Sequence, residues 1–340
     1  MRSGLSCLWS KNMYKYILKR LAMMIPVLIG ISIIIFTIIS LTPGNPARLI
    51  LGERASQEAI DQLNEELGYY DPLPVKYVNY MADLLHGDMG TSYRTGGTVV
   101  SEIAERFPTT LLLAVLDIFL TAVISIPLGV YIALKKNSFA DNALTIIALV
   151  FTAMPSFWLG MILMLIFAVG LNILPATGSD SFSCFILPAF TVALLSIAQI
   201  MRMTRSSMLE TLRADFMRTA RAKGVKENKI VWKHAIRNAL LPVVTTMGVN
   251  FGWALGGSVI TETVFGMSGV GTLTLLSVRS KDIPLVMGCV LFMSLLFSII
   301  TLIVDISYAF IDPRIKAQYG FKNKTRKAKR KETANVQPQS

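Results

Sequence analysis

LAMMIPVLIGISIIIFTIISL, residues 21–41, is a run without a single charged side chain, and runs of this kind decide the class of the protein. A helix needs about 20 apolar residues to cross the roughly 30 Å hydrocarbon core of a bilayer. Backbone groups in lipid have no water to bond, so each such run must be helical. A secretory signal peptide is the alternative for residues 21–41. However, the run is too long for an h-region, lacks a small-x-small cleavage site and is followed by further runs.

The composition favours the same class. Hydrophobic residues make up 53% of the 340 residues and charged residues 16%, so a soluble domain of this sequence would expose too much apolar surface. We therefore predict an all-α integral membrane protein with six transmembrane helices. Their predicted bounds are 21–41, 109–134, 143–171, 184–201, 241–263 and 283–311.

Charge alternates between the segments that connect these spans. The segment before the first span holds five basic residues and no acid, whereas loop 42–108 holds five basic and ten acidic residues. Loop 202–240 holds ten basic residues against three acids, and the tail after 311 holds nine against two. Basic loops stay in the cytoplasm, and the short N-terminal segment and loop 135–142 are the most informative. We expect both termini in the cytoplasm.

The net charge of +12 also raises the possibility of nucleic-acid binding. The basic residues flank spans and are not interleaved with aromatic residues, so attraction to anionic membrane lipid is the simpler interpretation and no nucleic acid is expected. Cys7, Cys184 and Cys289 are far apart and predict neither a disulfide framework nor a metal site. With only His86 and His234 present, a histidine-based metal site or catalytic triad is not expected.

Loop 202–240 is unusually long, and its pattern is helical. Met208, Leu212, Phe216 and Ala220 recur every four residues, with arginines and lysines on the other faces. Gly224 then ends the helix, and a second helical stretch runs from 227 to 241 before Pro242. Two interpretations are open at this point: an amphipathic hairpin lying on the bilayer, or a docking element for a cytoplasmic partner.

The residues of this loop resemble the EAA loop of ABC importer permeases, and more narrowly the dipeptide/oligopeptide/nickel permease family. The resemblance rests on Arg218, Thr219, Ala220, Arg221, Ala222, Lys223 and Gly224, followed by His234, Ala235, Ile236, Arg237, Asn238, Ala239, Leu240, Leu241 and Pro242. The general consensus differs, since Arg218-Thr219-Ala220 replaces Glu-Ala-Ala and Arg237 replaces a proline. The peptide subfamily shares these departures, which remove a consensus acid from the loop.

Further segments extend the resemblance over about residues 13 to 318. They are Thr42 to Ala47, Leu67 to Pro74, Gly87 to Ser92, Glu262 to Phe265, Gly269 to Gly271, Asp282 to Pro284 and Ile311 to Arg314. The resemblance implies a type I ABC importer permease fold with cytoplasmic N and C termini in a bacterial inner membrane. The implied segments are a cytoplasmic start (1–20), the first transmembrane helix (21–41), an external loop (42–96), a permease core (97–311) and a basic cytoplasmic tail (312–340).

In this family the short helix before the glycine is the coupling helix, which rests in a groove of the ATPase subunit. The implied partners are two cytoplasmic ATPase subunits, a second homologous permease subunit and an external solute-binding protein. This chain has no G-x-x-x-x-G-K-[ST] motif, so we expect ATP and Mg²⁺ on the partner ATPases and no cofactor or enzymatic site here. The expected cargo is a di- or oligopeptide, and nickel or glutathione-like solutes are the alternative. An ion-coupled secondary transporter is less favoured, because no internal repeat is apparent.

Polar residues inside the predicted spans are candidates for the pore. Asp117 is either a pore or gating group or a carboxylate bonded to a neighbouring helix. Asn250 needs a polar partner and is a second pore candidate, and Glu262 is expected where water reaches the external end of the fifth span. Asp305 is close enough to the cytoplasmic end to reach water.

Span 241–263 carries Gly248, Gly252 and Gly256 at a spacing of four, which gives one helix face a smooth stripe. Such a stripe favours close helix packing, and a sliding pore-side interface is the functional alternative. Prolines fall in or beside several spans and permit bends; they are Pro26, Pro127, Pro155, Pro188 and Pro242.

Overall fold

The computed structural model describes residues 2–41, 44–52 and 54–311, and these residues form a bundle of long helices. Thr42, Pro43 and the basic tail 312–340, including Asp312, Pro313 and Arg314, lie outside the described residues. In the described part, regular structure is helical, apart from one isolated bridge between Thr91 and Thr98. This agrees with the predicted all-α class.

The helices follow one another with short connections. In chain order they are α1 (Arg2–Leu41), α2 (Pro46–Leu51), α3 (Gln57–Glu66), α4 (Leu73–Leu85), α5 (Val99–Leu134), α6 (Phe139–Ala153), α7 (Ser156–Met164), the π-helical turn η1 (Leu165–Gly170), α8 (Ser183–Arg213), α9 (Asp215–Ala222), α10 (Glu227–Lys229), the π-helical turn η2 (Ile230–Ala235), α11 (Ile236–Gly257), α12 (Val259–Val264), α13 (Val270–Arg279) and α14 (Ile283–Ile311).

Five of the described helical segments are long and apolar enough to cross a membrane: Ile17–Leu41, Val99–Leu134, Ser183–Arg213, Glu227–Gly256 and Ile283–Ser307. A sixth candidate span is the pair α6 and α7 with η1, which is bent by 104° at a break. The predicted span 143–171 is therefore interrupted near Pro155, one of the prolines expected to permit a bend. Met154 lies just before Pro155 and adopts an extended conformation (φ −82°, ψ 133°), because a proline ring disfavours helical geometry in the residue before it.

Several spans are longer than hydropathy predicts, and α5 and α8 are two of them. α5 begins at Val99 instead of 109, and α8 continues to Arg213 instead of ending near 201. At the start of α5, the Thr98 side chain accepts a hydrogen bond from the Ser101 backbone N–H and forms a helix N-cap. Hydropathy detects only the part of a helix that lies in hydrocarbon, so amphipathic turns beyond it go unseen.

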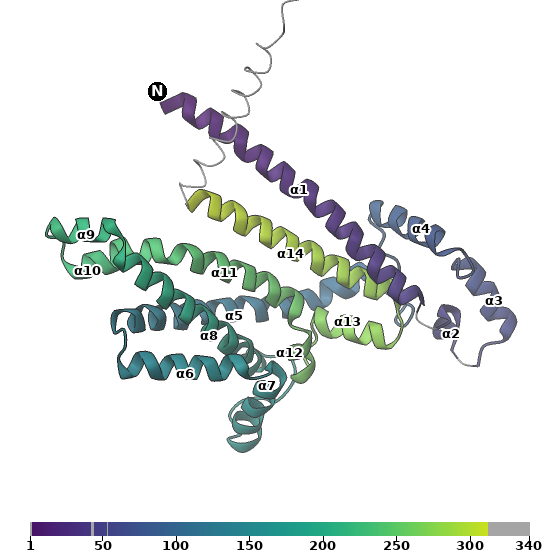
Figure 1. Cartoon of the computed structure of the whole chain (residues 1–340). Coiled ribbons are helices and arrows are strands. Elements are labelled where there is room, and N and C mark those ends of the chain that lie inside the picture. The colour runs from purple at the N-terminus through teal and green to yellow at the C-terminus, as the bar shows by residue number, and fades with distance from the viewer. Residues whose placement is uncertain (1, 42–43, 53, 312–340) are drawn as a thin grey trace, which may run out of the picture.

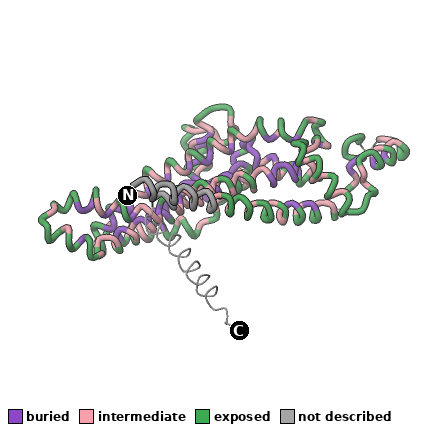
Figure 2. The backbone as a smooth tube through the Cα atoms, turned by 90° about the horizontal axis from the view of Figure 1, so that it is seen from above, coloured by how far each residue is buried: buried purple, intermediate pink, exposed green. Residues whose placement is uncertain are grey.

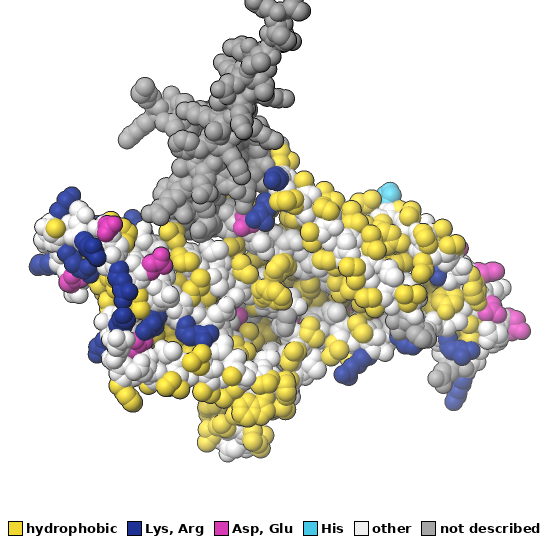
Figure 3. Space-filling model, viewed as in Figure 1, with side chains coloured by type: hydrophobic (Ala, Val, Ile, Leu, Met, Phe, Trp, Pro, Cys, Tyr) yellow, Lys and Arg dark blue, Asp and Glu magenta, His cyan; other side chains and the backbone are white. Residues whose placement is uncertain are grey.

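The long helices separate two sets of short ones (Figure 1). α2, α3 and α4 gather at one end of the bundle, beside α13, and α9 and α10 lie at the opposite end. Buried residues run along the interior of the bundle, while exposed residues cover its outer faces (Figure 2). In Figure 3, hydrophobic side chains cover much of the middle, and Lys and Arg side chains gather over the α9 end.

α5 and α8 form the closest helix pair, and Gly129 shows why. A Cβ atom at Gly129 would lie 2.6 Å from the Thr204 side chain and 2.7 Å from the Met201 carbonyl oxygen. Without a side chain, the α5 backbone lies directly on α8, as small residues allow in membrane helices.

The three spaced glycines of α11 have different surroundings. A side chain at Gly248 would collide with Val304, and one at Gly252 would come within 3.0 Å of Phe297, so both glycines lie against α14. Gly256 has no atom within 4 Å of the corresponding position. The smooth stripe thus packs against α14 along two of its three positions.

Candidate functional site

α9 is a short helix at one end of the bundle, set at an angle to α8. The chain leaves α8 at Arg213 and turns at Ala214, whose backbone is extended (φ −63°, ψ 148°). The predicted single helix through Met208 and Phe216 is therefore wrong. The break at Ala214 changes which residues face inward, so Phe216 is 47% exposed while Met217 is 0% exposed.

An apolar cluster fixes α9 to the rest of the bundle. Met217 points into this cluster together with Met208 of α8 and Ile230 and Val231 of η2. Val130 of α5 also contributes, so α9 rests on residues of α5, α8 and η2. Apolar contacts of this kind are non-directional, and they hold the buried face of α9.

Gly224 ends α9 in a left-handed turn. Its φ of +73° is a conformation that favours glycine. The Gly224 N–H donates to the Arg221 carbonyl at 2.9 Å, and the Val225 N–H donates to the Ala220 carbonyl at 3.3 Å. These two bonds form a Schellman motif, so the predicted helix end at Gly224 is confirmed. No atom lies within 4 Å of a Cβ built at Gly224, and its requirement for glycine is conformational.

The outer face of α9 carries charge and one aromatic ring. Arg218 is 77% exposed and lies 3.8 Å from Asp215, itself almost fully exposed. Arg221 reaches Glu227 of α10 at 2.6 Å, which closes the turn between the two helices. Thr219, Ala222 and Lys223 complete this short helix and its C-cap, with Thr219 and Lys223 exposed.

The second part of the predicted coupling loop continues into the next span without a break. The helix starts at Glu227, passes through η2 and continues as α11. Asn238 donates its side-chain N–H to the His234 carbonyl at 2.7 Å, and Arg237 is exposed. Pro242 lies inside α11 and does not mark the loop boundary that its position suggested.

Glu262 is the most enclosed carboxylate of the opposite end. The prediction that water reaches it is wrong, because the residue is 0% exposed. Its Oε1 accepts hydrogen bonds from the hydroxyls of Thr110 and Ser258, both at 2.7 Å, and its Oε2 accepts one from the Thr272 backbone at 2.8 Å. We call Glu262 with these three partners the Glu262 junction; it joins α5, α12 and α13.

Two glycines make room for this carboxylate. A side chain at Gly269 would overlap the Glu262 carboxyl group, and one at Gly271 would lie 2.8 Å from Oε2. Thr110 also accepts a hydrogen bond from the Val270 backbone at 2.9 Å. One structural unit is therefore formed by Glu262, Gly269 and Gly271. This packing gives a physical reason for the segments Glu262 to Phe265 and Gly269 to Gly271 that carry part of the family resemblance.

Asp282 forms a second anchor at the same end. Its carboxylate accepts hydrogen bonds from the Ser92 hydroxyl at 2.5 Å and the Arg94 backbone at 3.3 Å. It also caps α14 by accepting from the Leu285 backbone at 3.4 Å. Burial and the nearby Asp282 charge raise the pKa of Tyr93 to about 12, so this phenol stays neutral at physiological pH. The loop before α5 is thus tied to the start of α14.

Asp117 lies in the interior of the bundle. It is 1% exposed, and the Thr121 hydroxyl of the same helix donates to it at 3.2 Å. Ser196 of α8 lies near enough to influence the carboxylate. This burial against α8 favours the interpretation of a carboxylate that faces a neighbouring helix, and the pore or gating role stays a prediction.

Asn250 lies in a more open position. Its side-chain N–H donates to the Gln199 side-chain oxygen at 3.4 Å, across α11 and α8, and Gln199 is exposed. An amide pair at an exposed position within two spans is costly against lipid, and such groups usually face protein or a water-filled cavity. Gln199 was not among the residues predicted from sequence.

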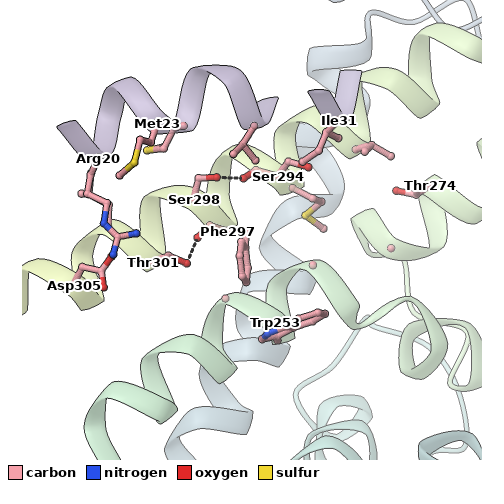
Figure 4. Close-up of a pocket in the computed structure, with 18 of the residues that line it drawn as sticks. Arg20, Met23, Ile31, Trp253, Thr274, Ser294, Phe297, Ser298, Thr301 and Asp305 are labelled. Carbon is pink, nitrogen blue, oxygen red and sulfur yellow. Dashed lines mark hydrogen bonds and ion pairs between the residues drawn. The ribbon is translucent and has the colours of Figure 1, made fainter. Parts of the chain in front are cut away.

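A cavity with a volume of about 600 Å³ lies between α1, α11 and α14. Its walls are mainly apolar, with Trp253 and Phe297 on one side and Met23 of α1 on the other (Figure 4). Arg20 of α1 and Asp305 of α14 form an ion pair of 2.8 Å at its edge. Asp305 therefore has a protein partner in addition to access to water.

Sequence reasoning missed one further ion pair. Arg205 of α8 forms two contacts with Asp141 of α6, at 2.6 and 2.7 Å, and Asp141 is buried. The Ser138 hydroxyl accepts from the Asp141 backbone at 3.2 Å and caps α6. The sequence signal was a Ser-x-x-Asp capping pattern, but nothing local identified Arg205 as the partner.

Comparisons with known proteins agree with this arrangement. Residues 125–317 match the family described as binding-protein-dependent transport system inner membrane component, and residues 13–114 match its N-terminal family. The dipeptide transport system permease protein DppB of Alkalihalophilus pseudofirmus is 40% identical over 89% of this chain and 100% of its own length. The glutathione transport system permease protein GsiC of Salmonella choleraesuis is 41% identical over 89% of this chain and 99% of its own.

A solved structure shares the fold. A chain of the methionine ABC transporter MetNI in an inward-facing conformation superposes with a TM-score of 0.50 and 18% identity, covering 63% of this chain and 97% of that one. The protein is a multi-pass protein of the cytoplasmic membrane, and it belongs to the binding-protein-dependent transport system inner membrane components, the permease subunits of ABC importers.

Proposed function

We propose that this chain is one of two pore-forming subunits of an importer for di- or oligopeptides, loaded by an external solute-binding protein and driven by separate ATPases. The family supports an importer permease, and the names of two relatives, a dipeptide permease and a glutathione permease, support a peptide-like cargo. Peptide is the substrate class common to those names, since glutathione is itself a small peptide.

The observation that carries this proposal is the construction of α9. It is a separate two-turn helix with one buried anchor, Met217, and an outer face that presents Phe216 and Arg218. We assign it the role of the coupling helix, received by a groove on a cytoplasmic ATPase. An exposed aromatic ring beside an exposed arginine is a common composition for a protein-contact surface.

In the proposed orientation, the α9 end faces the cytoplasm and α2, α3 and α4 face the outside. The ten basic residues of loop 202–240 support this assignment. Figure 1 adds support, because the beginning of α1 and the last described turns of α14 both lie toward the α9 side. Both termini are then cytoplasmic, and the solute-binding protein meets the loop that contains α2 to α4.

The transport pathway is proposed at the contact with a second, homologous permease subunit. The Gln199–Asn250 pair supports this, because a partner subunit or water between the subunits satisfies its remaining donors and acceptors. ATP and Mg²⁺ bind to the two ATPase subunits, and closure of those subunits moves α9. The ATP-bound form must favour one pore conformation by several kcal/mol for efficient switching.

The coupling assignment is tested by Gly224→Val in the assembled transporter. Valine at φ +73° is strained by about 1–2 kcal/mol, which disrupts the end of α9 without a steric collision. We expect ATP hydrolysis stimulated by peptide-loaded binding protein to fall about tenfold, while the subunit still inserts in the membrane. The control is Gly30→Val on α1, where a Cβ also meets no atom within 4 Å and φ is not positive. Normal uptake by Gly224→Val would contradict the coupling role.

The cargo is tested separately. Proteoliposomes that contain this chain, its partner permease, the ATPases and a solute-binding protein are supplied with labelled dipeptide, glutathione or a nickel chelate. ATP-dependent uptake of the dipeptide supports the proposal. Uptake of glutathione alone or of nickel alone would replace the substrate while leaving the importer assignment intact, and uptake driven by an ion gradient without ATP would overturn the mechanism.

A further inference from the structure

One face of the helix that enters the membrane after α9 is a two-part groove. Three cations, Lys229, Lys233 and Arg237, follow one another at a spacing of four residues, and all three are exposed. An apolar stripe runs beside them, formed by Trp232, Ile236 and Leu240. We call these six residues the Trp232 groove. Residues four apart lie one above the other on a helix, so the two stripes run parallel.

Among the described residues, no ion pair compensates the charge of this groove. Lys229, Lys233 and Arg237 have no ion-pair partner within the described residues, whereas Arg221 of α9 is paired with Glu227. The groove itself has no acidic lining residue. Three adjacent unpaired cations call for an anionic partner.

The position of the groove along the span indicates where that partner lies. The candidate span Glu227–Gly256 has 30 residues, and about 20 of them suffice to cross the hydrocarbon core. The excess of about ten residues corresponds to roughly 15 Å of helix at a rise of about 1.5 Å per residue. If Gly256 marks the far hydrocarbon boundary, Arg237 lies near the other one, and Lys233 and Lys229 lie about 6 and 12 Å further out, at the depth of the lipid headgroups.

The apolar stripe fits the same depth. Trp232 is 66% exposed, and tryptophan is enriched at membrane interfaces, where one edge of the ring is apolar and the other is hydrated. Ile236 and Leu240 continue from it toward the hydrocarbon. If the cations bind the phosphate of a lipid headgroup, the acyl chains of that lipid would therefore lie along the apolar stripe and continue into the bilayer.

We propose that the Trp232 groove is a binding site for an anionic membrane phospholipid, such as phosphatidylglycerol. The headgroup phosphate is bound by Lys233 with Lys229 and Arg237 on either side, and an acyl chain packs along Trp232, Ile236 and Leu240. The inference rests on the membrane span and does not depend on ATPase docking at α9.

Two other occupants are less suited to the groove. The tail of this chain, residues 312–340, holds nine basic residues against two acidic ones, so the groove would repel it. An acidic surface of an ATPase subunit would match the cations but has no need for an apolar stripe that continues into the bilayer. We therefore favour lipid and treat the protein contact as an outcome of the test.

The test uses Trp232 as its own reporter. The chain contains four tryptophans, and replacing Trp9, Trp158 and Trp253 with phenylalanine leaves Trp232 as the only indole. The full-length protein is reconstituted in vesicles in which brominated phosphatidylglycerol or brominated phosphatidylcholine supplies the quencher at the same low fraction. We expect the anionic lipid to quench Trp232 several-fold more than the neutral one, since each basic residue near the surface favours anionic lipid by roughly fivefold.

The decisive variant is the triple replacement K229Q/K233Q/R237Q, which should abolish the preference for anionic lipid. The matched control K135Q/K136Q/K223Q removes three exposed cations outside the groove and should retain it. Equal quenching by both lipids, or equal loss of preference in both triple variants, would overturn a specific site. Loss of quenching when the ATPase pair is added would assign the groove to a protein contact and also overturn it. If the tryptophan replacements impair folding, retention of phosphatidylglycerol over phosphatidylcholine by the natural chain in native mass spectrometry provides the same comparison.

Discussion

The α13 end of the bundle and the helix α9 at the opposite end are held by different kinds of contact. At the α13 end, Glu262 and Asp282 are buried, and backbone N–H groups and hydroxyls bond both carboxylates. At the α9 end, the charged side chains Arg218 and Lys233 face outward, and the contact that holds α9 is an apolar cluster around Met217.

Buried carboxylates at one end and apolar packing of α9 at the other indicate how one subunit can combine a fixed end and a movable end. The hydrogen bonds of a buried carboxylate have preferred directions, and loss of the carboxylate leaves its hydrogen-bond donors unsatisfied. Apolar side chains tolerate small displacements because their contacts have no preferred direction. We therefore expect the α13 end to act as a frame and the α9 end to transmit motion. The following predictions address this contrast, beginning with the largest expected effect.

Replacing Glu262 with alanine should be the most damaging change. The hydroxyls of Thr110 and Ser258 and the Thr272 backbone lose their shared acceptor in a site closed to bulk solvent, at a cost of about 3 kcal/mol or more. Thermal unfolding in detergent should show a strongly lowered midpoint. Glu105→Ala, on an exposed position of the same α5, is the control and should leave the midpoint nearly unchanged. An unchanged midpoint for Glu262→Ala would refute the idea of a fixed frame.

Replacing Asp141 with asparagine should have the next largest effect. It removes the negative charge and one of the two acceptor oxygens bonded to Arg205, and leaves that guanidinium without a counter-ion between α6 and α8, for a loss of about 2 kcal/mol. The same unfolding experiment measures it. Asp215→Asn at the start of α9 is the matched comparison, since its carboxylate is almost fully exposed and should contribute little. Equal effects of the two replacements would show that burial of Asp141 is unimportant.

Replacing Met217 with alanine should loosen α9 locally. The lost contacts correspond to about 2 kcal/mol, but α9 is a separate short helix, so hydrogen exchange of its backbone should accelerate while exchange in α5 remains unchanged. Phe216→Ala, on the exposed side of the same helix, should not accelerate exchange. Uniformly faster exchange along the whole chain would mean that the α9 end is as strongly coupled to the bundle as the α13 end.

Replacing Ser92 with alanine should have the smallest effect at the fixed end. One hydrogen bond to Asp282 is lost, worth about 1 kcal/mol, while the Arg94 and Leu285 backbone groups still bond that carboxylate. Limited proteolysis between residues 88 and 98 should become faster, with little change in thermal unfolding. The control is Ser181→Ala, at an exposed position of a different loop. If Ser92→Ala and Ser181→Ala are cleaved between residues 88 and 98 at the same rate, Ser92 does not anchor the loop.

Much of this protein follows from the sequence alone. Charge-free runs as long as a bilayer is thick determine the all-helical class, because the backbone in lipid must satisfy its own hydrogen bonds. Gly224 marked the end of α9 correctly, since its position after Arg221 and Lys223 is a local signal and a Schellman turn is a local structure. The order of the family's motifs was likewise sufficient to identify an importer permease.

Other features required the tertiary structure. Glu262 looked like a solvated helix end in sequence, yet Thr110, more than 150 residues away, encloses it. Arg205 and Asp141 are 64 residues apart, and no local pattern pairs them. The helix break at Ala214 reversed the exposure of Phe216 and Met217. Periodicity and hydropathy report the surroundings of a residue along its own helix, whereas burial and ion pairing depend on which other helices pack against it, and that is decided only when the bundle assembles.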